Sequence, residues 1–158
     1  KILELFSPPK ELDNFIESKY GKVIGNPNCV SVHVRRGDYL LPQFRSHHNN
    51  LGKEYYDSAM AHYHNDSTYV FFSDDIEWCK EAFQGRNAFF VENTNDVIDM
   101  YLMSKIPNNI IANSSFSWWG AWLNDHDQKS VIRPKKWFGP SNQHLIIKDL
   151  TPPSWLVI

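Results

Sequence analysis

The hydrophobic pattern of this chain alternates short strand-like runs with stretches of helical periodicity. In the clearest strand, valines at 30, 32 and 34 share one face, and Ser31 and His33 occupy the other. The predicted strands cover residues 29–34, 69–72, 88–91, 110–112 and 131–132, and the tail from 134 reads as irregular. Apolar residues three and four apart predict a helix beginning at Pro8-Pro9 and one between each pair of strands. This alternation predicts an α/β domain with a mostly parallel sheet.

The length and the net charge of the chain exclude several classes of function. With 158 residues, no repeat and no interior linker, we expect a single domain over 1–158. A formal charge of −2 gives no basic field for nucleic acid, and no apolar run approaches the ~20 residues of a membrane span. Cys29 and Cys79 lie in apolar segments and are expected to be buried free thiols. Because the chain starts at Lys1, we expect that a preceding segment has been removed.

Polar segments follow each predicted strand. In an open parallel sheet the loops after the strands gather at the carboxyl edge, where ligands bind. Five strand ends with five polar segments therefore predict one binding site at that edge. The segments are 35–38, 73–75, 92–95, 113–115 and 133–136.

The segment after the first strand is the most informative one. Residues two apart share a face of a strand, so His33 and Arg35 are expected to point the same way. Guanidinium groups of Arg35 and Arg36 match phosphate oxygens, and Gly37 allows a close backbone approach or a positive φ. Asp38 could hold one arginine in place. The alternative interpretation is a solvated Arg–Asp turn.

Two further segments allow a plain and a functional interpretation. Ser114 and Ser115 precede a tryptophan-rich helix, where they either cap the helix or form an anion site with its N–H groups. Asp74 and Asp75 either cap the following helix, or one of them accepts N–H donors from a nucleobase.

Metal binding and glycosylation are weakly supported. Asp125 and Asp127 have the D-x-D spacing that some sugar transferases use for a divalent metal, but they follow a helix rather than an apolar strand. The histidines have no partners at the usual zinc-ligand spacing. The acceptor patterns at Asn65 and Asn113 are interpreted as chance matches.

Three motifs together resemble a known family. Residues 33–39 (HVRRGDY) resemble the H-x-R-R-x-D signature of the α-1,2- and α-1,6-fucosyltransferases and their protein O-fucosyltransferase relatives. Residues 72–78 (FSDDIEW) and 113–122 (NSSFSWWGAW) resemble the α-1,2-fucosyltransferases, glycosyltransferase family 11, in particular. Their order and spacing agree over nearly the whole chain.

The resemblance implies a fold and a donor site. It implies the C-terminal, GDP-fucose-binding half of a GT-B glycosyltransferase: a Rossmann-like, mostly parallel sheet with helices on both faces, without the N-terminal acceptor lobe. Arg35 would hold the β-phosphate as the catalytic residue. The other donor-binding residues would be His33, Arg36, Asp38, Asp74 or Asp75 for guanine, Ser114, Ser115 and Phe116.

The implied reaction is inverting transfer of L-fucose from GDP-fucose to the 2-hydroxyl of a galactose-terminated glycan, without a metal cofactor. This chain alone is expected to be inactive, since the acceptor lobe of the same polypeptide would be missing. The rival hypotheses are a non-catalytic nucleotide- or phosphoglycan-binding module and a metal-dependent transferase using Asp125 and Asp127. The expected location is cytoplasmic or peripheral to the membrane in a bacterium, which we favour, or the Golgi lumen in a eukaryote.

Overall fold

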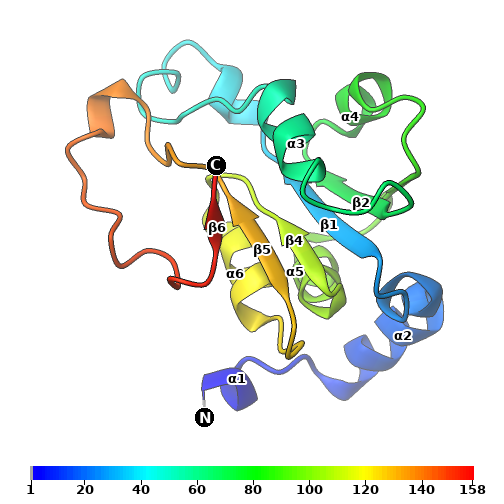
Figure 1. Ribbon diagram of the computed structural model, residues 1–158. Coiled ribbons are helices and arrows are strands. Elements are labelled where there is room, and N and C mark those ends of the chain that lie inside the picture. Colours follow the sequence, from blue (N-terminus) through cyan, green and yellow to red (C-terminus); the bar gives the residue numbers. More distant parts are fainter. Residues whose placement is uncertain (1) are drawn as a thin grey trace.

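Six strands form one sheet in the computed structural model, which describes residues 2–158. The strand order is β3-β2-β1-β4-β5-β6 and every neighbouring pair is parallel (Figure 1). This is the order of doubly wound nucleotide-binding sheets, so the predicted fold class is confirmed. The strands are β1 (Cys29–Val34), β2 (Thr68–Ser73), β3 (Ala88–Phe90), β4 (Asn108–Ile110), β5 (Ser130–Arg133) and β6 (Leu156–Val157).

Helices cover both faces of the sheet. The helices α3 and α4 lie on one face, and α2, α5 and α6 lie on the other (Figure 1). The helices are α1 (Ile2–Leu5), α2 (Lys10–Ile24), α3 (Lys53–Met60), α4 (Ile76–Ala82), α5 (Asp96–Lys105) and α6 (Ser115–Leu123). Two short 3-10 helices, η1 (Gly37–Leu40) and η2 (Pro140–Asn142), lie in the loops after β1 and β5.

The central strand β1 is buried along its whole length. Its three valines pack toward α3 and α4 in one apolar cluster. On the opposite face, Val70 and Phe72 of β2 pack against α2 and α5. Burial on both faces explains why the middle of β2 is a continuous apolar run, whereas β1 also buries Ser31 and His33 on its second face. Cys29 and Cys79 are buried free thiols, as expected.

The structure corrects several predicted boundaries. The strand β4 begins at Asn108 and ends at Ile110, because the pairing with β1 and β5 starts two residues before the apolar run. The tail contains β6, which the sequence analysis missed, since two exposed residues carry no strand pattern. The start of α2 agrees with the prediction, because Pro9 is its N-cap residue.

Within residues 2–158, no helix combines the length and the apolar character that a membrane crossing needs.

Candidate functional site

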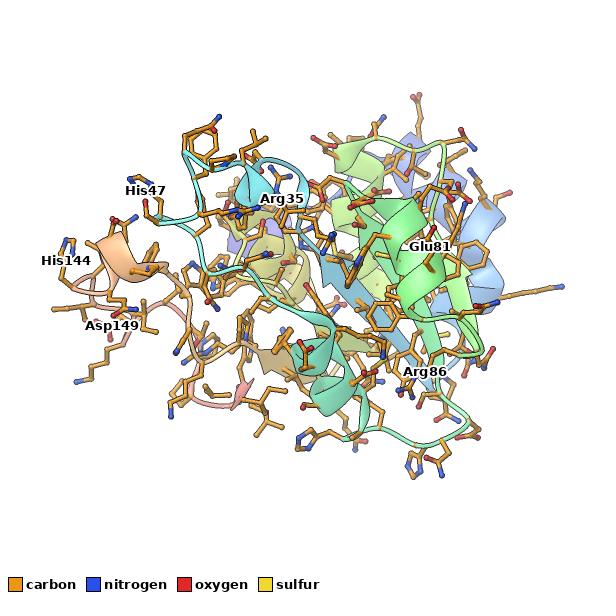
Figure 2. The ribbon with its side chains drawn as sticks, turned by 90° about the horizontal axis from the view of Figure 1, so that it is seen from above. Arg35, His47, Glu81, Arg86, His144 and Asp149 are labelled. Carbon is orange, nitrogen blue, oxygen red and sulfur yellow. The ribbon has the colours of Figure 1, made fainter. Side chains whose placement is uncertain are left out.

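The strand order reverses between β1 and β4, and a parallel sheet binds ligands at the carboxyl end of such a switch point. The loops after β1, β2, β3 and β4 meet there. Figure 2 looks onto this edge and shows Arg35 near its centre, with His47 and His144 on the side of the C-terminal segment.

Two carboxylates hold the guanidinium of Arg35 from different sides. Its Nη2 lies 2.7 Å from Oδ1 of Asp38, and its Nη1 lies 3.3 Å from Oδ2 of Asp74. The guanidinium carbon also lies 5.4 Å from the ring centroid of Tyr39. The Arg35 side chain nevertheless remains 34% exposed. Arg35 is therefore oriented in advance and still accessible to an anion.

Arg36 has a different environment. Its Nε lies 2.9 Å from Oδ2 of Asp75, and its guanidinium stacks over Trp78 at 4.0 Å. Its backbone N–H donates to Oδ1 of Asp74. Arg36 thus ties the loop after β1 to the start of α4. Arg36 is not among the residues that line the cleft at Arg35, and its assignment to the donor site stays a prediction.

Asp74 and Asp75 already have protein partners. Asp75 caps α4, because its Oδ1 accepts the backbone N–H of Trp78 at 3.3 Å. A Cβ on Gly37 would collide with the Asp74 carboxylate and displace it, so Gly37 allows the close approach of Asp74 and is not there for a positive φ. Their assignment to guanine stays a prediction, and the plain interpretation of Asp75 as a helix cap is confirmed.

A cleft of about 210 Å³ opens beside Arg35 on the α5 and α6 side of the sheet. A second hollow of about 330 Å³ shares Ser73, Asp96 and Asp99 with it. The two together extend from Arg35 along the carboxyl ends of β2 and β3. The cleft is lined by His33, Arg35, Phe72, Ser73, Asp74, Asp96, Asp99 and Phe116.

His33 lines the cleft together with Arg35, as the shared face of β1 predicted. The residue is only 5% exposed, and its Nδ1 has no hydrogen-bond partner within the described part of the chain. Burial, and secondarily the charge of Arg35, lowers the pKa of His33 to about 3. His33 is therefore neutral near pH 7, and its Nδ1 is a buried polar atom that no described residue pairs with.

Asp99 is a residue of the cleft that was not predicted from the sequence. Its carboxylate lines both hollows, and burial raises its pKa above the ordinary value. Its buried Oδ1 has no hydrogen-bond partner among residues 2–158. The sequence does place Asp99 one turn after Asn95 and Asp96, in a helix that follows a predicted strand end. Acidic residues are common in the first turn of any helix, so this position alone does not indicate a site.

The N-terminus of α6 borders the same cleft. Oγ of Ser114 accepts the backbone N–H of Phe116, so the serine cap is confirmed. Ser115 is exposed. The Phe116 ring lies 5.3 Å from the His33 ring and forms one wall of the cleft.

Asn113 connects the loops around the site. Its side-chain amide donates to the carbonyl oxygens of Asn49 and Trp137, at 2.8 Å each. The backbone carbonyl oxygen of Asn113 accepts a hydrogen bond from the Tyr39 hydroxyl at 3.2 Å. The side-chain amide of Asn113 is therefore buried, and its nitrogen already donates two hydrogen bonds in the folded chain.

Asp125 and Asp127 lie away from this site. Both are exposed and follow the end of α6, before the amino end of β5, at the edge of the sheet opposite Arg35. Across the described residues, no group of three or more His, Cys, Asp or Glu side chains could hold a metal ion.

Comparison with known proteins places the chain in a family. The model of "Glycosyl transferase family 11" matches residues 10–156. The chain belongs to glycosyltransferase family 11. This family 11 chain is 40% identical to the O-antigen biosynthesis glycosyltransferase WbnK of Escherichia coli, over 98% of this chain and 54% of that protein. It is 38% identical to an alpha-1,2-colitosyltransferase of Escherichia coli, over 100% of this chain and 56% of that protein.

The chain thus spans about half the length of the curated relatives it matches. Among solved structures, it resembles NodZ alpha-1,6-fucosyltransferase, from a crystal soaked with GDP-fucose, with a TM-score of 0.50 and 18% identity. That match covers 73% of this chain and 42% of the other, and it supports the fold.

Proposed function

We propose that this family 11 chain binds the GDP part of a GDP-sugar and forms the donor-binding half of an inverting fucosyl-type transferase. The observation that carries the proposal is Arg35, which two carboxylates orient and which remains exposed in a cleft at the switch point. A guanidinium fork matches the paired oxygens of a phosphate. The cleft beside it has room for a nucleoside along the ends of β2 and β3.

Arg35 would act mainly as the transferred sugar leaves. When the bond from the sugar to the β-phosphate breaks, negative charge grows on the phosphate oxygens. A cation already fixed at that position stabilises the charge without reorganisation, and one such group can lower the barrier by about 3–4 kcal/mol. Asp38 and Asp74 hold the guanidinium in place before the donor arrives. Metal independence stays a prediction of this arrangement.

Guanine recognition has two candidate groups. The sequence-based candidates, Asp74 and Asp75, contact Arg35 and Arg36. Asp99 lines the cleft, and its buried Oδ1 has no hydrogen-bond partner among the described residues. A carboxylate can accept both the N1–H and the 2-amino group of guanine, so Asp99 is the better placed reader of the base.

The sugar and the acceptor follow from the relatives. We propose transfer of L-fucose, or of the colitose for which one relative is named, to the 2-hydroxyl of a terminal galactoside. The acceptor would be held by a further lobe of the natural polypeptide, because this chain spans about half of its relatives. Both relatives come from Escherichia coli, which supports a bacterial protein.

Titration calorimetry of this chain with GDP, UDP and ADP tests the donor site, and GDP-fucose and GDP-colitose then compare the sugars. We expect GDP to bind at least about tenfold more tightly than ADP, because adenine leaves the carboxylate unpaired. Equal affinity for all three nucleotides would contradict the proposal. GDP binding with no transfer by the full-length polypeptide would favour a binding module instead.

A further inference from the structure

His48 lies beside the proposed phosphate site, in the loop that follows β1 and η1. Its imidazole stacks on the Tyr39 ring, with centroids 3.9 Å apart and planes 12° apart. The guanidinium of Arg35 lies 5.4 Å from the same Tyr39 ring. Tyr39 therefore links His48 directly to the residue that would hold the leaving phosphate.

The backbone around His48 is clamped against the C-terminal segment. His48 forms an antiparallel bridge with Phe138, and the N–H of Gly139 donates to the carbonyl oxygen of His47 at 2.9 Å. A Cβ on Gly139 would collide with the backbone of residues 46–48. The imidazole is thus positioned by a fixed backbone and by one stacking contact.

Both ring nitrogens of His48 lack a protein hydrogen-bond partner within residues 2–158. The neighbouring His47 differs, since its Nδ1 pairs with Oγ of Ser46 and its side chain is exposed. His48 is only partly buried, and it lies close enough to Asp38 and Arg35 for both charges to act on its ring.

The charges around His48 favour a neutral imidazole near pH 7. Partial burial lowers its pKa below the ordinary 6.5, and the charges of His47 and Arg35 act in the same direction. Asp38 is the opposing charge and raises the pKa of His48. A neutral imidazole with a free nitrogen can accept a proton.

We propose that His48 is the general base that takes the proton from the acceptor hydroxyl. This inference rests on the proposed function. The acceptor oxygen forms a bond to the anomeric carbon of the sugar while its proton passes to a ring nitrogen of His48. The bond from that carbon to the β-phosphate oxygen breaks, and the electron pair stays on the phosphate beside Arg35. His48 then releases its proton to solvent.

Other basic groups at this edge are less suited to the role. Asp38 and Asp74 are engaged in ion pairs with Arg35, so neither carboxylate is free to contact an acceptor hydroxyl. His33 is almost fully buried, and its pKa of about 3 makes it a much weaker base. His48 combines accessibility with useful basicity.

A titration of this chain by NMR tests the position of His48. The imidazole pKa of His48 is measured without nucleotide and at saturating GDP, with His48→Phe used to assign the resonance. Because a bound diphosphate places negative charge near the ring, we expect GDP to raise this pKa by at least about half a unit. An unchanged pKa at proven GDP saturation would overturn the proposal.

A transfer assay on the full-length polypeptide tests the chemistry. His48→Phe keeps an aromatic ring on Tyr39 but has no nitrogen, so kcat should fall about 10²–10⁴-fold while GDP affinity stays within about twofold. The decrease of kcat toward acid pH that the wild type shows should be absent in His48→Phe. His48→Ala should recover activity with added imidazole, and the control His47→Phe should retain it.

The outcomes separate the two proposals. If the wild-type chain does not bind GDP, the proposed function fails and the base assignment fails with it. If GDP binds and His48→Phe transfers sugar at the wild-type rate, only the base assignment is wrong. If His48→Ala is inactive and imidazole does not restore it, the stacking contact is structural, which also overturns the assignment.

Discussion

His33 makes the stability of the chain sensitive to acid. Its pKa is about 3 in the folded chain and near 6.5 when unfolded, so the unfolded state binds the extra proton first. The stability that neutral His33 contributes is complete above pH 6.5 and is lost as pH falls toward 3. From pH 7.5 to pH 5, this linkage should remove about 2 kcal/mol of unfolding free energy.

Urea denaturation of the wild type and His33→Gln at both pH values measures this effect. The variant lacks the buried titrating group and should lose about 2 kcal/mol less over the same interval. His62→Gln alters an exposed histidine and is the matched control, with a wild-type pH dependence expected. Equal losses in the wild type and His33→Gln would show that burial of His33 does not govern the acid response.

Substitutions at Asp99 and Asp75 are expected to have different effects on base selectivity. Asp99→Asn removes a carboxylate that lines the cleft and whose Oδ1 is unpaired, so the preference for GDP over ADP should shrink by about tenfold or more. Asp75→Asn should mainly destabilise α4, because Asp75 caps that helix and pairs with Arg36. Paired GDP and ADP titrations on both variants decide between them. If Asp75→Asn abolishes the preference and Asp99→Asn retains it, the sequence-based assignment is correct.

Among the elements of the fold, the loop after β1 depends on Asn113. Asn113→Ala leaves the buried carbonyls of Asn49 and Trp137 without a donor, which should cost about 2–4 kcal/mol of unfolding free energy. Chemical denaturation measures the loss. Asn142→Ala is the control, since the hydrogen bond of the Asn142 side chain to the His47 carbonyl oxygen is a long one of 3.5 Å, and the change should cost less than about 0.5 kcal/mol. Equal costs for both variants would show that Asn113 does not hold the loops together.

Strands and helices with strong periodicity could be predicted from the sequence, and weakly patterned ones could not. The valines of β1 define a strand and both of its faces, and the structure has that strand with the predicted bounds. The strand β6 has two exposed residues, and its existence depends on pairing with β5. Likewise, the sequence locates the arginines at a strand end, but the contacts of Arg36 with Trp78 and Asp75 arise from packing and carry no local signal.

Asp99 shows the same limit for the site. The sequence shows that this residue is a carboxylate. Its burial and its unpaired oxygen arise from the packing of α5 beside β2, which cannot be predicted from a local sequence pattern.

For the molecule as a whole, the account predicts catalysis without a metal. Arg35 supplies the positive charge at the phosphate, and Asp125 and Asp127 lie at the other edge of the sheet. EDTA should therefore leave fucosyl transfer by the full-length polypeptide within about twofold of its untreated rate. Asp125→Asn combined with Asp127→Asn should be equally active. Loss of activity in EDTA, restored by Mn²⁺ only when both aspartates are present, would support the metal-dependent alternative.

The most direct test of the whole account is the GDP affinity of Arg35→Ala, measured by calorimetry on this 158-residue chain. Loss of a charge-assisted contact to phosphate should cost about 1.5–3 kcal/mol, which weakens binding roughly tenfold to a hundredfold. Arg86→Ala is the matched control, because Arg86 pairs with Asp57 outside the cleft, and its GDP affinity should equal that of the wild type. Wild-type affinity in a correctly folded Arg35→Ala variant would contradict the assignment of this edge of the sheet as a GDP-sugar site.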